Sequence, residues 1–148
     1  MHNKEYESII GSLFAIIPLL KRDLIKPELN NEAYNLSSSH FHILFMLEDL
    51  GVQSMSDIGK HMQINKSNLT PLVQKLIDHQ LVERIADEKD RRYIRIGLTA
   101  MGIKLLEVYK VKMAEHLMKK LSILKPEELQ KLADSLTNVK ELMLKLYE

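Results

Sequence analysis

The sequence contains no cysteine, and this absence sets the first limits on what the protein can be. Disulfide bonds, thiolate metal sites and a cysteine-based redox sensor are all excluded, and the composition fits a reducing cytosol. Long apolar runs are also missing, because the most apolar stretch, near the N-terminus, follows acidic residues and is interrupted by Pro18. No small-residue cleavage site follows it. We therefore expect neither a signal peptide nor a membrane span, no membrane partner and a cytoplasmic location.

The arrangements that usually carry catalysis are absent as well: there is no nucleophile beside a base, no phosphate loop and no cluster of metal ligands. His40 and His42 invite a zinc hypothesis, but residues two apart point to different sides of a helix. We interpret His40 as a hydrogen-bonding group at a helix start and His42 as a packed or surface residue. His61 and His79 are interpreted as capping or surface groups, and His116 lies on a long helix with no residues at ligand spacing nearby. We expect no enzymatic activity, no cofactor and no bound metal.

The net charge of +1 hides a segregation along the chain. Residues 1–59 hold four Lys/Arg against eight Asp/Glu, whereas residues 60–95 hold eight against five. This distribution suggests a basic surface confined to the middle of the chain.

Capping residues and apolar spacing predict the helices. An amphipathic helix with a broad apolar face is expected over residues 5–25, kinked at Pro18. Ser37 is placed as the N-cap of the next helix, with His40 at its third position and Gly51 at its end.

Two short helices separated by a three-residue turn are expected next. Ser54 caps the first, in which Gly59 is tolerable if another backbone passes close by. The turn is Gln63, Ile64 and Asn65, and the second helix covers residues 66–79. This spacing predicts a helix-turn-helix.

The second of these helices has a polar outer face suited to reading base edges in a major groove. For this helix taken alone, an ordinary solvated polar face is the favoured interpretation. The candidate DNA-binding residues on it are Lys66, Ser67, Asn68, Thr70, Pro71, Gln74 and Lys75.

A β-hairpin with a charged tip follows, formed by the runs LVERI and YIRIGL. Its tip, residues 86–92, supplies Lys89, Asp90, Arg91 and Arg92, and arginine there can enter an adjacent minor groove. Asp90 is expected to fix the guanidinium of Arg92 through a hydrogen-bonded ion pair. Arg84 is expected to be structural, pairing with acidic residues of the wing. The order of elements favours a winged DNA-binding domain.

Two long helices complete the chain. Thr99 is placed as the N-cap of a helix running to about Leu121, and Pro126 begins the last helix. The last helix carries an apolar heptad seam: Leu129, Leu132, Leu136, Val139, Met143 and Leu146. A small winged domain cannot cover this seam and the N-terminal apolar face together, so a second copy is expected to bury them.

The predicted fold is mainly α with a small β-hairpin wing: a winged helix-turn-helix with long N- and C-terminal dimerisation helices. Residues 1–35 and 100–148 are assigned to the helical dimerisation region. Residues 36–99 are assigned to the winged helix-turn-helix DNA-binding domain, continuous with it in one fold.

The motif Asp90-Arg91-Arg92 followed by Leu98-Thr99-Ala100-Met101-Gly102 resembles the D-x-R wing and the L-T-x-x-G helix start of the MarR (multiple antibiotic resistance regulator) family. Leu36–His40, Asp57–Gly59, Leu69-Thr70 and Leu81–Arg84 are similar to further positions of that family. The resemblance implies a homodimer bound to a pseudo-palindromic operator in double-stranded DNA, and a repressor released by a small molecule.

The resemblance extends to the helix that would read DNA. Asn68–Leu72 is similar to the recognition helix of the family's peroxide-sensing branch, but that branch's reactive cysteine is missing, so a thiol mechanism is not implied. Gln80 stands where the family usually has glycine, the residue that most easily adopts a left-handed backbone, so the sequence leaves the conformation of this turn open.

A small anionic or aromatic effector is the remaining expected partner, because relatives bind such ligands between the dimerisation helices and the winged domain. The candidate residues are Lys21, Arg22, His40 and Tyr109, each of which is also interpretable as a solvated or core residue. The alternative function is a winged-helix protein-interaction module that does not bind an operator.

Overall fold

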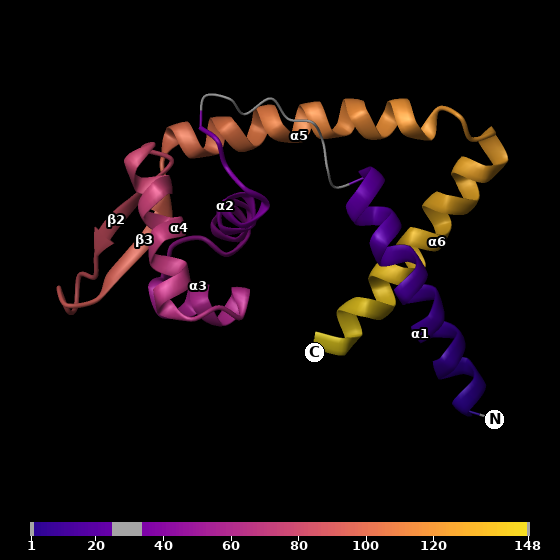
Figure 1. The fold of residues 1–148 in the computed structure, drawn as a ribbon, viewed down its shortest axis with the longest axis horizontal. Helices are drawn as coiled ribbons and strands as arrows, with labels where there is room; N and C mark the ends of the chain where they lie inside the picture. The colour runs from indigo at the N-terminus through magenta and orange to yellow at the C-terminus, as the bar shows by residue number, and fades with distance from the viewer. Residues whose placement is uncertain (1, 25–33, 148) are drawn as a thin grey trace. The chain divides into compact units, whose positions relative to one another are not determined.

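The computed structural model describes residues 2–24 and 34–147. The chain divides into two compact units, one formed by Met1–Pro27 with Lys112–Glu148 and the other by Glu28–Val111. Its elements are helices and one small antiparallel sheet (Figure 1), which confirms the predicted mainly α fold with a β wing. None of the described helices is long and apolar enough to cross a membrane.

The N-terminal segment is helical but not regular. Helix α1 spans His2–Leu19, and a π-helical turn, η1, follows over Leu20–Leu24. Pro18 has no N–H to donate to the preceding turn, and the regular helix ends one residue after it. The predicted helix is therefore present, but its last described turn is π-helical and not α-helical. Its last residue lies outside the described residues.

Helix α2 spans Ser38–Leu50 and begins as the sequence predicts. Ser37 is the N-cap, and its backbone N–H donates to Nδ1 of His40 at 3.0 Å. The Ser37 hydroxyl lies 2.8 Å from the same nitrogen. Gly51 ends the helix with a φ of 77° and donates its N–H to the Leu47 carbonyl. The predicted role of His40 as a helix-start hydrogen bonder is confirmed.

The helix-turn-helix is formed by α3 (Met55–Met62) and α4 (Lys66–Asp78), joined by the predicted three-residue turn. The hydroxyl of Ser54 accepts the N–H of Asp57 at 3.1 Å and so caps α3. A Cβ added at Gly59 would lie 3.2 Å from the Ile64 carbonyl oxygen, so the predicted close backbone approach is confirmed. This approach holds the two helices at a short, fixed turn.

A three-stranded antiparallel sheet completes the winged unit, in the order β1-β3-β2. Strands β2 (Val82–Ala86) and β3 (Ile94–Leu98) form the predicted hairpin. Strand β1 is only Gln53–Ser54, pairing with β3, and was not predicted because two residues show no alternation. The core beneath the sheet is formed by fully buried side chains from α2, α3, α4, β2, β3 and α5, including Ile43, Leu44, Ile58, Leu69, Leu76, Ile96 and Leu106.

Hydrogen bonds connect the turn that follows α4 to the start of α5 (Ala100–Leu121). The turn that the sequence left open at Gln80 is left-handed, with a φ of 59°. Thr99 caps α5, because its hydroxyl accepts the Gly102 N–H at 3.1 Å and donates to the Gln80 carbonyl at 2.6 Å. The Thr99 N–H donates to the Leu81 carbonyl at 3.1 Å. The turn is thereby fixed by backbone and hydroxyl groups together.

The C-terminal segment leaves its apolar side chains exposed. Helix α6 spans Pro126–Leu144 and continues into a short 3₁₀ turn, η2, over Lys145–Tyr147. None of its residues is buried, and the Leu136 side chain of the heptad seam is 57% exposed. Helix α1 behaves similarly, with Phe14 74% exposed. The heptad seam therefore lies at the surface of a single chain.

Candidate nucleic-acid interface

The first turn of α4 presents polar groups held in place by its cap. Asn65 is the N-cap: its side-chain oxygen accepts the Asn68 N–H at 2.9 Å and the Ser67 hydroxyl at 2.8 Å. The Thr70 hydroxyl donates to the Lys66 carbonyl at 2.7 Å. These residues are all exposed, as is Pro71. The remaining amides of this turn and the Lys66 ammonium make it suited to a phosphate oxygen.

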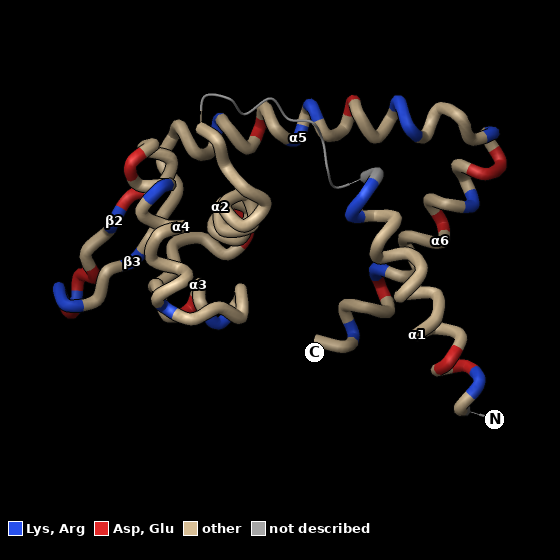
Figure 2. The backbone as a smooth tube through the Cα atoms, in the orientation of Figure 1, with Lys and Arg blue, Asp and Glu red and all other residues tan. Residues whose placement is uncertain are grey.

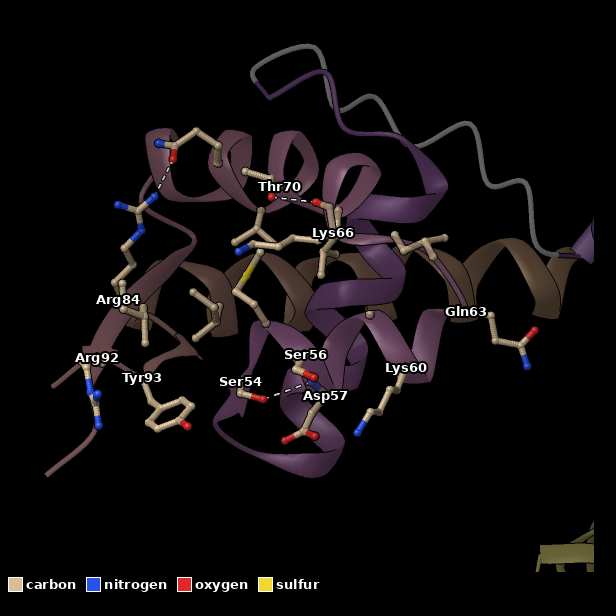
Figure 3. A pocket seen from close by; sticks show the side chains of 18 residues that line it. Ser54, Ser56, Asp57, Lys60, Gln63, Lys66, Thr70, Arg84, Arg92 and Tyr93 are labelled. Carbon is tan, nitrogen blue, oxygen red and sulfur yellow. Dashed lines mark hydrogen bonds between the residues drawn. The ribbon is translucent and has the colours of Figure 1, made fainter. Parts of the chain in front are cut away.

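A groove of about 920 Å³ lies between α3, α4 and the hairpin (Figure 3). Of the predicted DNA-binding residues, Lys66, Thr70, Gln74 and Arg92 line it. The groove thus brings together α4 and the wing, which are different elements of the sequence. Ser67, Asn68 and Pro71 lie on the exposed turn of α4 without lining the groove.

Several lining residues were not identified from the sequence: Ser54, Met55, Ser56, Lys60 and Tyr93. Tyr93 lies between Arg92 and the first residue of β3 and is 63% exposed. Figure 3 shows Tyr93 on the hairpin side of the groove and Ser54, Ser56 and Lys60 on the α3 side. The sequence signal that could have identified Tyr93 is an aromatic residue directly after the wing motif.

Lys75 has a different environment from the other predicted residues of α4. Its ammonium donates to the Asn35 carbonyl at 2.6 Å, and the side chain does not line the groove. Burial lowers the pKa of His40, and the nearby positive charges of Lys75 and His79 lower it further. The hydrogen bond to the Asn35 carbonyl shows that Lys75 faces the chain preceding α2.

Gln74 is hydrogen-bonded at both ends of its amide. Its oxygen accepts from Nη2 of Arg84 at 2.7 Å, and its nitrogen donates to Oδ1 of Asp78 at 2.8 Å. The prediction that Arg84 pairs with wing acids is wrong, because Arg84 on β2 points to α4 and reaches a neutral amide (Figure 3). Sequence order could not indicate this contact, since it joins residues of different elements.

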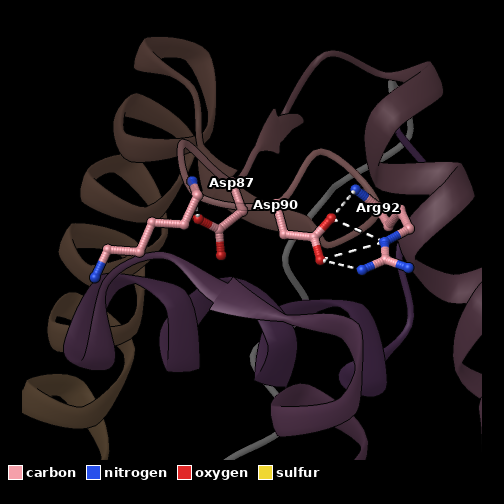
Figure 4. A network of polar contacts seen from close by, with 4 residues as sticks. Asp87, Asp90 and Arg92 are labelled. Atoms are coloured by element: carbon pink, nitrogen blue, oxygen red, sulfur yellow. Dashed lines mark hydrogen bonds and ion pairs between the residues drawn. The ribbon is translucent and has the colours of Figure 1, made fainter.

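Asp90 and Arg92 form the predicted ion pair at the wing tip (Figure 4). The guanidinium Nη2 lies 2.8 Å from Oδ2 of Asp90, Nε donates to Oδ1 at 3.1 Å, and the Arg92 backbone N–H also donates to Oδ1 at 3.0 Å. The side-chain bond to Arg92 lowers the pKa of the Asp90 carboxyl, and the same bond raises the pKa of Arg92. The Arg92 side chain is nevertheless 88% exposed, so its outer face is open to a ligand.

The rest of the wing turn is ordered by hydrogen bonds of Asp87, one through its side chain and one through its backbone. Asp87 accepts the Lys89 N–H at 3.0 Å through Oδ1, and its own N–H donates to the Tyr93 carbonyl at 3.1 Å. Lys89 and Arg91 are exposed, and Figure 2 shows basic and acidic residues interleaved at this tip. The tip therefore offers separate cations rather than one unbroken basic patch.

The residues considered for a metal or an effector differ in their environments within the described residues. Within residues 2–24 and 34–147, no three His, Cys, Asp or Glu side chains are grouped so as to hold a metal ion. Of the effector candidates, His40 and Tyr109 are buried in the winged unit, where Tyr109 packs against the rings of Phe41 and Phe45. Lys21 and Arg22 lie in η1, in the other unit.

The fold and this groove define a winged helix-turn-helix protein. Comparison with known proteins places it more closely. Residues 36–94 match the model of the MarR family. The chain is 28% identical over 99 residues to the uncharacterized HTH-type transcriptional regulator YpoP of Bacillus subtilis, covering 67% of this chain and 70% of that one. It is 27% identical over 139 residues to a second such regulator of Bacillus subtilis, YhbI, covering 92% and 88%.

The fold agrees with this relationship. A crystal structure of wild-type MarR from E. coli, in its apo form, matches with a TM-score of 0.68 at 19% identity, covering 87% of this chain and 95% of that one. Residues 36–94 therefore match a MarR-family domain, and the chain is similar to winged-helix transcriptional regulators. Regulators of this family are DNA-binding proteins without enzymatic activity.

Proposed function

We propose that the protein binds a pseudo-palindromic operator in double-stranded DNA as a homodimer, with α4 in the major groove and the wing in the minor groove. The observation that carries this proposal is the shared groove: Lys66, Thr70 and Gln74 of α4 line the same concavity as Arg92 of the wing. Short polar side chains on a helix can read base edges, and arginine is attracted to a narrow minor groove. The DNA-contacting residues are proposed to be Lys66, Ser67, Asn68, Thr70, Pro71, Gln74, Lys89, Arg91 and Arg92, with Asp90 orienting Arg92.

Lys75, the remaining predicted contact, would reach DNA only by leaving its bond to the Asn35 carbonyl. We therefore propose for Lys75 a contribution to the positive potential of α4 and no direct contact with a base.

The exposed apolar side chains of the terminal helices support the homodimer. Eight large hydrophobic residues of α1 between Tyr6 and Leu19 are at least 40% exposed, and α6 buries none of its own. An apolar surface of this extent on a water-exposed chain is typical of an interface. In a two-fold dimer the two recognition helices would lie about one DNA turn, roughly 34 Å, apart.

Binding at an operator is proposed to repress transcription in the cytoplasm until a small anionic or aromatic molecule releases the protein. The repressor role and the effector follow from the family resemblance and rest on no contact described above.

Selection from a randomised duplex library tests the DNA-binding proposal. The parent protein is expected to enrich sequences with two inverted half-sites, and Arg92→Ala is expected to bind them more weakly with a shallower salt dependence. Random recovery by the parent would contradict operator binding and favour a protein-interaction role. Repeating the selection with anionic aromatic compounds tests the release step.

A further inference from the structure

We propose that Arg84 is a positioning residue for base recognition: it fixes the side-chain amide of Gln74 so that Gln74 reads an adenine in the major groove. This inference rests on the proposed operator binding and adds to it a residue that need not touch DNA. It starts from the chain of two hydrogen bonds that runs from Arg84 through Gln74 to Asp78.

The two bonds leave the amide only one favourable orientation. A guanidinium only donates hydrogen bonds, and an ionised carboxylate only accepts them. The Gln74 oxygen must therefore face Arg84, and its nitrogen must face Asp78. Rotating the amide by half a turn would put its NH₂ group against the guanidinium and its oxygen against the carboxylate. Both contacts would then be repulsive, so the orientation follows from chemistry.

An amide held in this way keeps one acceptor lone pair and one donor N–H available for a further hydrogen bond. A glutamine side chain can accept two hydrogen bonds at oxygen and donate two from nitrogen. Among the described residues, one of each is used, which leaves one lone pair and one N–H. Adenine presents in the major groove an N6 amino donor and an N7 acceptor, the complementary pair.

Arg84 also connects the Gln74 amide to the wing. Arg84 lies on β2 opposite Ile96 of β3, in the hairpin whose tip carries Arg92. Fixing Gln74 before DNA arrives reduces the side-chain entropy lost on binding, and it couples the amide to the sheet rather than to α4 alone. Loss of Arg84 should therefore act at the base that Gln74 reads.

The experiment measures binding of each single-base-pair variant of the sequence that the parent selects from a randomised duplex library. Four variants are compared with the parent: Gln74→Ala, Arg84→Ala, the double variant, and Arg95→Ala. Arg95 is an exposed arginine on the neighbouring strand β3, so its loss removes the same charge from the same sheet. Thermal unfolding of each variant checks that the fold is retained.

Gln74→Ala is expected to reduce the preference for A·T at one position of each half-site by about tenfold, within the roughly 5–150-fold range of a bidentate base contact. Arg84→Ala should reduce the same preference at the same position by about threefold or more, and should add nothing in the Gln74→Ala background. Arg95→Ala should leave the preference unchanged and weaken all sequences alike.

The positioning role is overturned if Arg84→Ala weakens every sequence equally, as expected for Arg95→Ala, or if its effect on the preference persists without Gln74. Failure of the parent to select any sequence would instead overturn the proposed function itself. A further test uses the unmodified protein without DNA and does not depend on either binding outcome. NMR should find the Gln74 side-chain amide more ordered than that of Gln63, which is exposed. Equal disorder of the two amides would also overturn the proposal.

Discussion

Gly102 lies directly against the carbonyl group of Leu81: a Cβ added at Gly102 would be 2.1 Å from the Leu81 oxygen. This oxygen also accepts the Thr99 N–H. The L-T-x-x-G motif is therefore a packing requirement, since the first turn of α5 touches the backbone that enters β2.

Gly102→Ala is expected to destabilise the fold by about 1–3 kcal/mol, because the added methyl group must displace backbone rather than a flexible side chain. Denaturant unfolding of the parent and the variant would measure the change. Gly11→Ala is the matched control: a Cβ at Gly11 meets nothing within 4 Å, and the change in a helix interior should stabilise by up to about 1 kcal/mol. Equal effects of the two substitutions would contradict the close approach.

Asp90→Ala is expected to weaken operator binding even though it removes a negative charge from a DNA-facing loop. The reason is that Asp90 holds Arg92 through its side chain and its backbone. Glu88→Ala removes the same charge from the same exposed turn and should leave affinity equal or higher. Affinities at several salt concentrations would separate the two. Stronger binding by Asp90→Ala would show that charge alone matters in the wing.

The Asp90–Arg92 pair also predicts a pH dependence. Because Arg92 lowers the pKa of Asp90 in the folded state, the contribution of the pair is present above the carboxyl's unfolded pKa and is lost as pH falls through the folded value. The order of the wing, followed by the NMR signal of the Arg92 Nε–H, should therefore persist to a lower pH than the ordinary titration of an aspartate and be lost below it. Asp90→Asn should remove this transition.

His40 predicts a separate pH dependence of stability. Burial, followed by the charges of Lys75 and His79, lowers its pKa below 6.5, so folding favours the neutral ring. The contribution is complete above pH 6.5, the unfolded value, and is lost as pH falls through the folded pKa. The free energy of unfolding should fall accordingly below that pH, and His40→Gln should reduce the slope while keeping an acceptor for the Ser37 N–H. His42→Gln, at an exposed position, should leave the slope intact.

Leu136→Lys is expected to shift the protein from dimer to monomer, because it places a charge in the exposed seam of α6. Asn138→Lys adds the same charge two residues further along, on another side of the helix, and should leave the association unchanged. Sedimentation equilibrium across a concentration series would measure both. A monomeric parent would contradict the proposed interface.

The sequence predicts best what neighbouring residues determine. The caps at Ser37, Ser54 and Thr99 were identified correctly because each bonds a group within three residues. The left-handed turn at Gln80 was left open, because glutamine has no preference for that conformation. Strand β1 was missed because two residues carry no periodic signal and pair with a strand far along the chain.

The site shows the same division. The Asp90–Arg92 pair spans two residues and was predicted, whereas the partners of Arg84 and Lys75 lie in other elements and were not. A helical wheel gives the direction of a Cα–Cβ bond but not the reach of a long side chain, which can pass around the helix to a distant carbonyl. The groove itself needs three elements to be folded together before it exists.

The hydrogen bonds of Thr99 connect two helices of the winged unit. Two hydrogen bonds from Thr99 and the close approach of Gly102 hold the start of α5 against Gln80 and Leu81, which follow α4. Helix α5 runs uninterrupted from the winged unit into the helical one. The start of α5 is thus held to the turn that follows α4, so a substitution that disturbs Thr99 should disturb both helices.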